Sequence, residues 1–197
     1  MCAGRTNFEN RSLVDPRGAP ARIVDEFERV LSDALDERPI QEFLSMNPSC
    51  LTPLAPPGGG YWCLDRPRLG AEFVPDFLLG SKTSIGTIWT AIEIEGPTER
   101  QLTRQGVPAS KLAQALRQVR DWRGWLRDNI TYARHQLGLT DIDGELSAFV
   151  VIGRRSTINP QQVQLYRGLS DNRTVVMSYD RLVDLMKRSS NLEAHSE

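Results

Sequence analysis

Apolar residues recur at steps of three and four through residues 21–46, which is the period of one face of an α-helix. The stripe begins with Ile23 and Phe27 and continues beyond Pro39. Because proline lacks a backbone N–H and crowds the preceding turn, Pro39 is predicted to divide this stretch into two helices. The prolines and glycines of 52–60 break the pattern, and the sheet is predicted to begin after them.

The pattern then becomes extended and later alternates between strand and helix. Strands are predicted at 72–79 and 87–95, and the loop between them contains Gly80 and Gly86, which suits an antiparallel hairpin. The remaining predicted elements are a helix at 110–129 with Ser110 as its N-cap, a strand at 148–152, a helix opening at Asn159 and Pro160, a strand at 174–177 and a helix at 179–187. This order predicts an α/β fold with one central mixed sheet flanked by helices.

The chain of 197 residues is long enough for one domain with a sizeable core. We expect that domain at 21–188, with a helical lead-in at 21–57 and the main core at 58–188. The segments 1–20 and 189–197 contain few large apolar groups, so they are predicted to be flexible tails.

Composition narrows the class of protein. Apolar residues make up 40% and charged residues 25% of the chain, as in soluble folded domains. No apolar run approaches the ~20 residues of a membrane helix, and the N-terminus lacks the apolar stretch of a secretion signal. We therefore expect a cytoplasmic protein without a membrane partner. Three cysteines without C-x-x-C spacing indicate neither a disulfide framework nor a zinc site.

Charge is unevenly distributed although the net charge is only −1. Residues 100–134 contain eight Lys or Arg and two Asp. Arg117 and Arg120 belong to a series at three- and four-residue spacing, which could follow a phosphate backbone or form a solubilising face. Arg154 is a further candidate for a phosphate contact.

Carboxylates interrupt the apolar strands. A two-residue period places Glu93 and Glu95 on one face, and Asp76 follows Pro75 in the preceding strand. Carboxylate oxygens suit Mg²⁺ or Mn²⁺, and a hydrolytic metal also needs positions open to substrate and water. A solvated edge strand is the alternative explanation for the two glutamates.

Polar residues also share a line on the predicted helix. Gln118 and Trp122 lie seven and eleven residues after Lys111, each within about 20° of whole helical turns. The line borders the apolar stripe and is therefore predicted to look into a cleft. A solvated lysine and a capping amide are the alternatives for Lys111 and Gln118.

The motifs Pro75-Asp76-Phe77 and Glu93-Ile94-Glu95, followed by Gln118, resemble the PD-(D/E)xK restriction-endonuclease-like superfamily. A longer set of segments is similar to the nuclease domain of the Shedu family. These segments are 72–77, 89–97, 110–112 and 118–123, preceded by 41–44 and 47–48 and followed by 152–154 and 179–180.

The resemblance implies a restriction-endonuclease-like core with an added N-terminal helical segment. It implies a bacterial anti-phage protein that cuts DNA with Mg²⁺ or Mn²⁺ and often assembles as a homo-oligomer. Asp76 and Glu93 would be metal ligands, the carbonyl of Ile94 a further ligand, and Gln118 the helix residue that shapes the site. Glu72 would be an additional acid near the metal.

The sequence departs from the superfamily pattern at Glu95, where a lysine usually orients water and stabilises charge on the phosphate. A glutamate cannot supply that positive charge. Lys111 could replace it, Glu95 could itself be a ligand in a two-metal site, or catalysis could be lost. The alternatives to a nuclease are therefore a catalytically inactive nucleic-acid-binding or assembly module, or a protein-binding domain.

Overall fold

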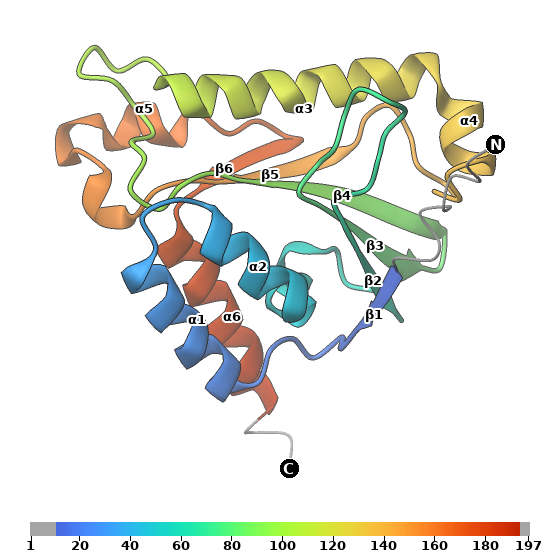
Figure 1. Cartoon of the computed structure of the whole chain (residues 1–197), viewed down its shortest axis with the longest axis horizontal. Helices are drawn as coiled ribbons and strands as arrows, with labels where there is room; N and C mark the ends of the chain where they lie inside the picture. Colours follow the sequence, from blue (N-terminus) through green and yellow to red (C-terminus); the bar gives the residue numbers. More distant parts are fainter. Residues whose placement is uncertain (1–10, 194–197) are drawn as a thin grey trace.

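The computed structural model describes residues 11–193 as a six-stranded sheet with helices on both faces (Figure 1). The strands are β1 (Arg11–Val14), β2 (Tyr61–Asp65), β3 (Phe77–Thr83), β4 (Gly86–Ile94), β5 (Ser147–Val151) and β6 (Thr174–Met177). The α-helices are α1 (Ala21–Asp33), α2 (Arg38–Met46), α3 (Ser110–Asp128), α4 (Ile130–His135), α5 (Val163–Arg167) and α6 (Tyr179–Glu193). Short 3₁₀ helices are η2 (Pro48–Leu54), η3 (Arg155–Thr157) and η4 (Pro160–Gln162).

The strands lie side by side in the order in which they occur along the chain. β1 to β4 pair antiparallel, whereas β4, β5 and β6 pair parallel. Each parallel pair is connected through helical segments, as parallel strands require a long crossover. β4 therefore lies where the sheet changes from antiparallel to parallel pairing, and both of its edges are occupied.

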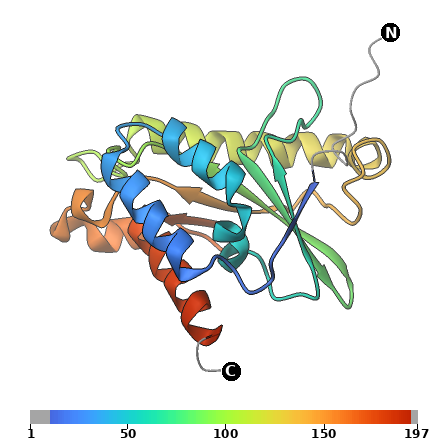
Figure 2. The same cartoon turned by 60° about the horizontal axis from the view of Figure 1, so that its bottom comes forward.

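Two hydrophobic cores cover the two faces of the sheet. One is built with α1, α2 and α6 and receives Ile92 and Ile94 of β4. The other is built with α3 and α4 and receives Trp89 and Ala91 of the same strand. Figures 1 and 2 show α3 along one face and α1, α2 and α6 on the other. Strand alternation therefore directs the odd-numbered residues of β4, including Glu93, toward the α3 side.

Most of the predicted elements are present, with shifted ends. The antiparallel hairpin is confirmed, but its strands extend closer to the turn, which leaves only Ser84 and Ile85 between them. Pro39 lies in the first turn of α2, where a missing N–H is tolerated, so two separate helices do form. The α/β class and the single mixed sheet are confirmed.

The predicted tails need correction where the structure describes them. Arg11–Val14 is not flexible chain but the edge strand β1, because its backbone pairs antiparallel with β2. α6 likewise extends through Glu193 instead of ending at 187. The predictions for 1–10 and 194–197 fall outside the described residues. In the described part, 11–193, no helix is long and apolar enough to cross a membrane.

Candidate metal and nucleic-acid site

Asp76 and Glu93 meet where β3 begins and β4 ends. Phe77 pairs with Ile92, so the next step of the antiparallel register brings Asp76 opposite Glu93. Asp76 Oδ2 accepts a hydrogen bond of 2.9 Å from the N–H of Ile94. The two carboxyl groups also hydrogen-bond to each other, and the N–H of Asp76 donates to Glu93. The backbone of two paired strands thus fixes both side chains.

Burial makes this pair difficult to ionise without a cation. Glu93 is only 6% exposed, and burial raises the pKa of both carboxyl groups. The charges of Asp76 and Glu95 raise the pKa of Glu93 further, so the pair resists losing its last proton. Glu93 Oε2 is buried and has no hydrogen-bond partner within residues 11–193. An unpartnered carboxyl oxygen beside a second carboxyl group fits a divalent cation.

The predicted ligand set is only partly assembled. Asp76, Glu93 and the backbone at Ile94 lie together. No group of three or more His, Cys, Asp or Glu side chains within 11–193 is arranged to hold a metal ion. A divalent cation at the Asp76–Glu93 pair would therefore complete its coordination with backbone oxygen and water, as Mg²⁺ commonly does.

Glu95 lies just beyond β4 and contacts Lys111 at the start of α3. The two charged groups are 3.4 Å apart, and the side chain of Glu95 is 7% exposed against 41% for Lys111. Burial raises the pKa of Glu95, and Lys111 opposes this rise, whereas the carboxylate raises the pKa of Lys111. The Tyr179 hydroxyl donates to the Glu95 carbonyl at 2.8 Å, which fixes the backbone here. Glu95 therefore holds the Lys111 ammonium group just beyond the end of β4.

Gln118 remains a weaker member of the site. Its Oε1 atom is buried without a hydrogen-bond partner in the described chain. It lies about two helical turns after Lys111, but no hydrogen bond joins it to the acids of the described residues. Trp122, predicted on the same line, is 1% exposed and belongs to the core of the α3 face.

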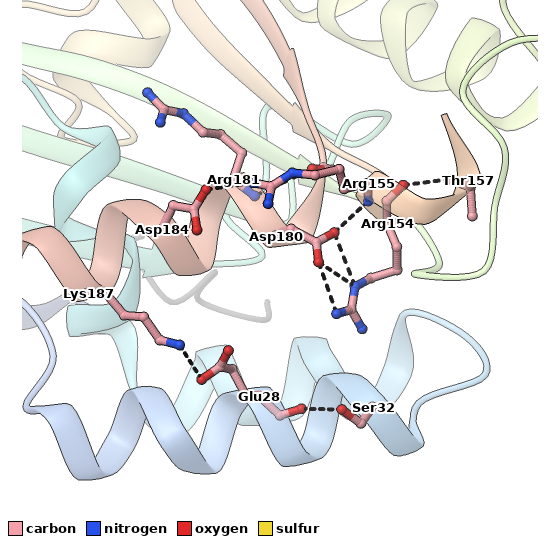
Figure 3. Close-up of polar contacts among 10 residues, drawn as sticks. Glu28, Ser32, Arg154, Arg155, Thr157, Asp180, Arg181, Asp184 and Lys187 are labelled. Atoms are coloured by element: carbon pink, nitrogen blue, oxygen red, sulfur yellow. Dashed lines mark hydrogen bonds and ion pairs between the residues drawn. The ribbon is translucent and has the colours of Figure 1, made fainter. Parts of the chain in front are cut away.

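The arginines predicted to bind DNA lie apart from the carboxylates. Arg117 and Arg120 are exposed on α3, and Arg120 is nine residues from Lys111, which places it on the opposite side of the helix. Arg154 forms an ion pair with Asp180 at 3.0 Å (Figure 3). Its guanidinium group therefore has a structural partner at the start of α6.

Glu72 is exposed in the loop before β3, and within 11–193 it makes no hydrogen bond or ion pair with the site. The acid that does join the site is Glu37, which precedes α2. Its charge raises the pKa of Asp76, Glu95 and Lys111, although it is not the main cause for any of them. It also lines a cavity of about 260 Å³ together with Asp76.

Sequence reasoning missed Glu37 because it lies in a run of charged residues, Asp36-Glu37-Arg38, that looks like ordinary helix-start surface. The one signal available in the sequence is the place of Glu37 between Asp36 and the start of the predicted second helix. Asp36 accepts a hydrogen bond from the N–H of Arg38, so the turn is capped by the neighbouring acid and Glu37 is left to face the cavity.

Comparison with known proteins gives one family. The model of the Shedu protein SduA C-terminal region matches residues 34–183, which include Glu37, both strands of the carboxyl pair and α3. No curated protein matches the chain. Because the match spans most of its length, the chain belongs to the Shedu family.

Proposed function

We propose that this Shedu-family chain is a divalent-metal-dependent DNA nuclease that acts in anti-phage defence. The observation that carries the proposal is the pair of buried Glu93 and half-buried Asp76, in which a carboxyl oxygen of Glu93 without a hydrogen-bond partner in the described chain suits Mg²⁺ or Mn²⁺. Family membership supports the defence role. DNA as the polymer and assembly of several copies are expectations of the same family resemblance.

In this proposal Asp76 and Glu93 would hold the cation, with the backbone carbonyl of Ile94 as a further ligand. The cation would polarise a phosphate oxygen and lower the pKa of a bound water. In the same proposal Lys111 would help to orient the reacting phosphate, and the burial of Glu93 keeps its carboxyl group away from bulk water. The neighbouring Ile94 N–H holds Asp76 in its rotamer through the 2.9 Å hydrogen bond.

Lys111 would supply the positive charge that Glu95 cannot. Of the three explanations for the missing lysine, the 3.4 Å ion pair favours replacement by Lys111. Glu95 is then a positioning residue, because its buried carboxylate holds the flexible lysine side chain near the phosphate. A preorganised donor of this kind stabilises charge that develops on phosphate oxygens.

Cleavage of supercoiled and linear DNA with Mg²⁺ or Mn²⁺ tests the proposal. Asp76→Asn keeps an acceptor for the Ile94 N–H but removes a ligand charge, so cutting should disappear while the fold remains. Lys111→Gln should slow cutting by about 10²- to 10³-fold, the usual cost of one charge-stabilising donor. Glu72→Gln is the matched acid control and should cut like wild type. Equal cutting by Asp76→Asn and wild type would refute the site.

The second candidate is a nucleic-acid-binding or assembly module without catalysis. The observation that favours it is Glu95 itself, which places an acid where the superfamily usually has lysine. It predicts that the protein binds DNA but yields no product at any Mg²⁺ or Mn²⁺ concentration. Light scattering of the same preparation measures whether several copies assemble.

A further inference from the structure

The cavity beside Asp76 is walled by two segments that are distant in sequence. One is the start of α2, and the other comprises the two ends of the β2–β3 connection, residues 66–76. Its volume is about 260 Å³, and it is lined by Glu37, Arg38, Gln41, Arg66, Val74 and Asp76. The cavity therefore combines one proposed metal ligand with two guanidinium groups.

Neither guanidinium group is engaged in a close contact in the described chain, although the charge of Arg66 lowers the pKa of nearby Asp76. The side chains of Arg38 and Arg66 are exposed, and within residues 11–193 neither forms an ion pair or a side-chain hydrogen bond. Arg154 and Arg155, by contrast, are bound to the acids of α6, as Figure 3 shows. Free guanidinium groups at the mouth of a cavity suit a phosphate, which they can bind through two parallel hydrogen bonds.

Arg66 is held in place by its backbone. Its φ angle is 45°, in the left-handed region that residues other than glycine rarely adopt. Its N–H donates to the carbonyl of Asp76 at 2.9 Å, which stabilises this conformation. Unusual backbone conformations persist where the surrounding structure fixes them, and they are frequent at functional sites. Here the conformation ties the arginine to the same residue that would hold the metal.

The acids of the cavity make anion binding depend on the cation. Arg38 and Arg66 carry two positive charges, and Glu37 and Asp76 can carry two negative charges. The cavity alone is then close to neutral. A divalent cation at Asp76 and Glu93 would leave a positive excess on the side of the two arginines.

We propose that Arg38 and Arg66 bind a backbone phosphate of DNA next to the phosphate at the metal, so that the strand crosses the start of α2. The proposal rests on the proposed function, because it assigns the DNA path to the same site. It replaces Arg117 and Arg120, which lie on the exposed side of α3, as the principal phosphate contacts.

Fluorescence anisotropy with a labelled DNA duplex tests the contact without relying on cleavage. Binding is measured in Ca²⁺ over a range of KCl concentrations, and a gel checks that the DNA stays intact. The test variant is Arg38→Gln with Arg66→Asn, because asparagine tolerates a positive φ. The matched control is Arg117→Gln with Arg120→Gln, which removes the same two charges from α3.

The test variant should bind DNA about tenfold or more weakly, and its plot of log affinity against log salt should be shallower by about 0.9, the value for one lost phosphate contact. The α3 variant should keep the wild-type slope. In EDTA the difference between wild type and the test variant should shrink, because the cavity is then nearly neutral. Circular dichroism and thermal unfolding verify that both variants fold.

The outcomes separate this inference from the nuclease proposal. If wild type binds DNA without cutting it and the test variant shows the weaker affinity and the shallower salt dependence, the phosphate contact is supported and the nuclease proposal is refuted. If wild type cuts DNA but the test variant keeps its affinity and slope, the contact is refuted and the nuclease stands. Equal loss in both double variants also refutes the contact, because it would show a general charge effect. A wild-type protein that neither binds nor cuts DNA refutes both. Should the test variant not fold, Arg38→Gln alone must show the weaker affinity and the smaller slope.

Discussion

Replacing Glu93 by glutamine should stabilise the protein while removing its proposed activity. The carboxyl group is buried beside Asp76 and carries a proton in the metal-free protein, because burial first and the neighbouring acids second raise its pKa. A glutamine amide has nearly the same shape as a protonated carboxyl group and can donate the same hydrogen bond to Asp76. The variant therefore keeps the contact without having to take up a proton.

The size of the effect follows from proton linkage. The pKa of Glu93 is raised from an ordinary 4.5 to about 9, so at pH 7 the folded protein is protonated and the unfolded chain is ionised. The folded state binds more protons, so stability falls as pH rises from 4.5 toward the folded pKa. About 2.5 pH units separate 4.5 from 7, and each is worth about 1.4 kcal/mol, which gives roughly 3 to 4 kcal/mol at pH 7.

Urea unfolding followed by tryptophan fluorescence in EDTA measures this gain. Glu93→Gln should be roughly 3 to 4 kcal/mol more stable than wild type at pH 7, and the difference should vanish near pH 4.5 and grow above pH 7. Glu72→Gln serves as the control, since this acid is exposed and its replacement should change little at any pH. Saturating Mg²⁺ should stabilise wild type and narrow the gap, because a ligand stabilises the state that binds it.

Two results would refute this reasoning. A variant less stable than wild type at pH 7 would mean that Glu93 is ionised and favourably paired in the metal-free protein. A gain of the same size at pH 5 and pH 8 would mean that packing, and not a shifted proton equilibrium, explains the difference.

Three further substitutions and one control variant test the surroundings of the site by thermal or urea unfolding. Tyr179→Phe should cost about 1 to 2 kcal/mol, because a buried carbonyl after β4 loses its hydrogen-bond donor. Burial raises the pKa of Asp180, but hydrogen bonds from the Arg154 side chain and the N–H of Arg155 outweigh it, so the pKa is lowered. Its stabilisation is present above pH 3.8 and is lost as pH falls through the lower folded value, so Asp180→Asn should cost about 2 kcal/mol at pH 7 and weaken the acid dependence. Gly153→Ala should cost more than about 2 kcal/mol, because φ is 65° and a Cβ there would overlap a backbone carbonyl, whereas Gly59→Ala has open space and should be nearly neutral.

The part of the fold that was predictable from sequence depends on local periodicity. The stripe of α3 and the short apolar run of β5 match their structures to within a residue at most ends, because packing on one face and local propensity agree there. β1 and β2 gave no comparable signal. The run Tyr61–Asp65 is a strand because its backbone pairs with β1 and β3. Cys63 and Leu64 then face different cores, so both faces are apolar and no alternation in polarity marks the strand in the sequence.

The residues of the candidate site also fall into those that local sequence patterns could place and those that they could not. Asp76 and Glu93 could be placed together because the hairpin register is local and their residue types are informative. Lys111 could be proposed as a replacement for the missing lysine, and the structure pairs it with Glu95, whereas Trp122 of the same predicted line lies in the core. Glu37 and Arg66 could not be placed, because their positions depend on how the start of α2 packs beside the β2–β3 loops. Such contacts between distant segments have no periodic trace in the sequence.

The order of the strands has a consequence for how the chain is completed during synthesis. Each strand pairs with the strand that is next to it in the sequence. A strand can therefore pair as soon as the next strand has been synthesised, and the loop that is closed is only the segment between the two. Helix α1 is the exception, because it packs against α6 at the other end of the chain. α2 follows α1 and packs on it, so the wall that bears Glu37 becomes secure only when α6 has emerged from the ribosome. A nascent chain can thus bring Asp76 and Glu93 together before α6 secures the wall that bears Glu37.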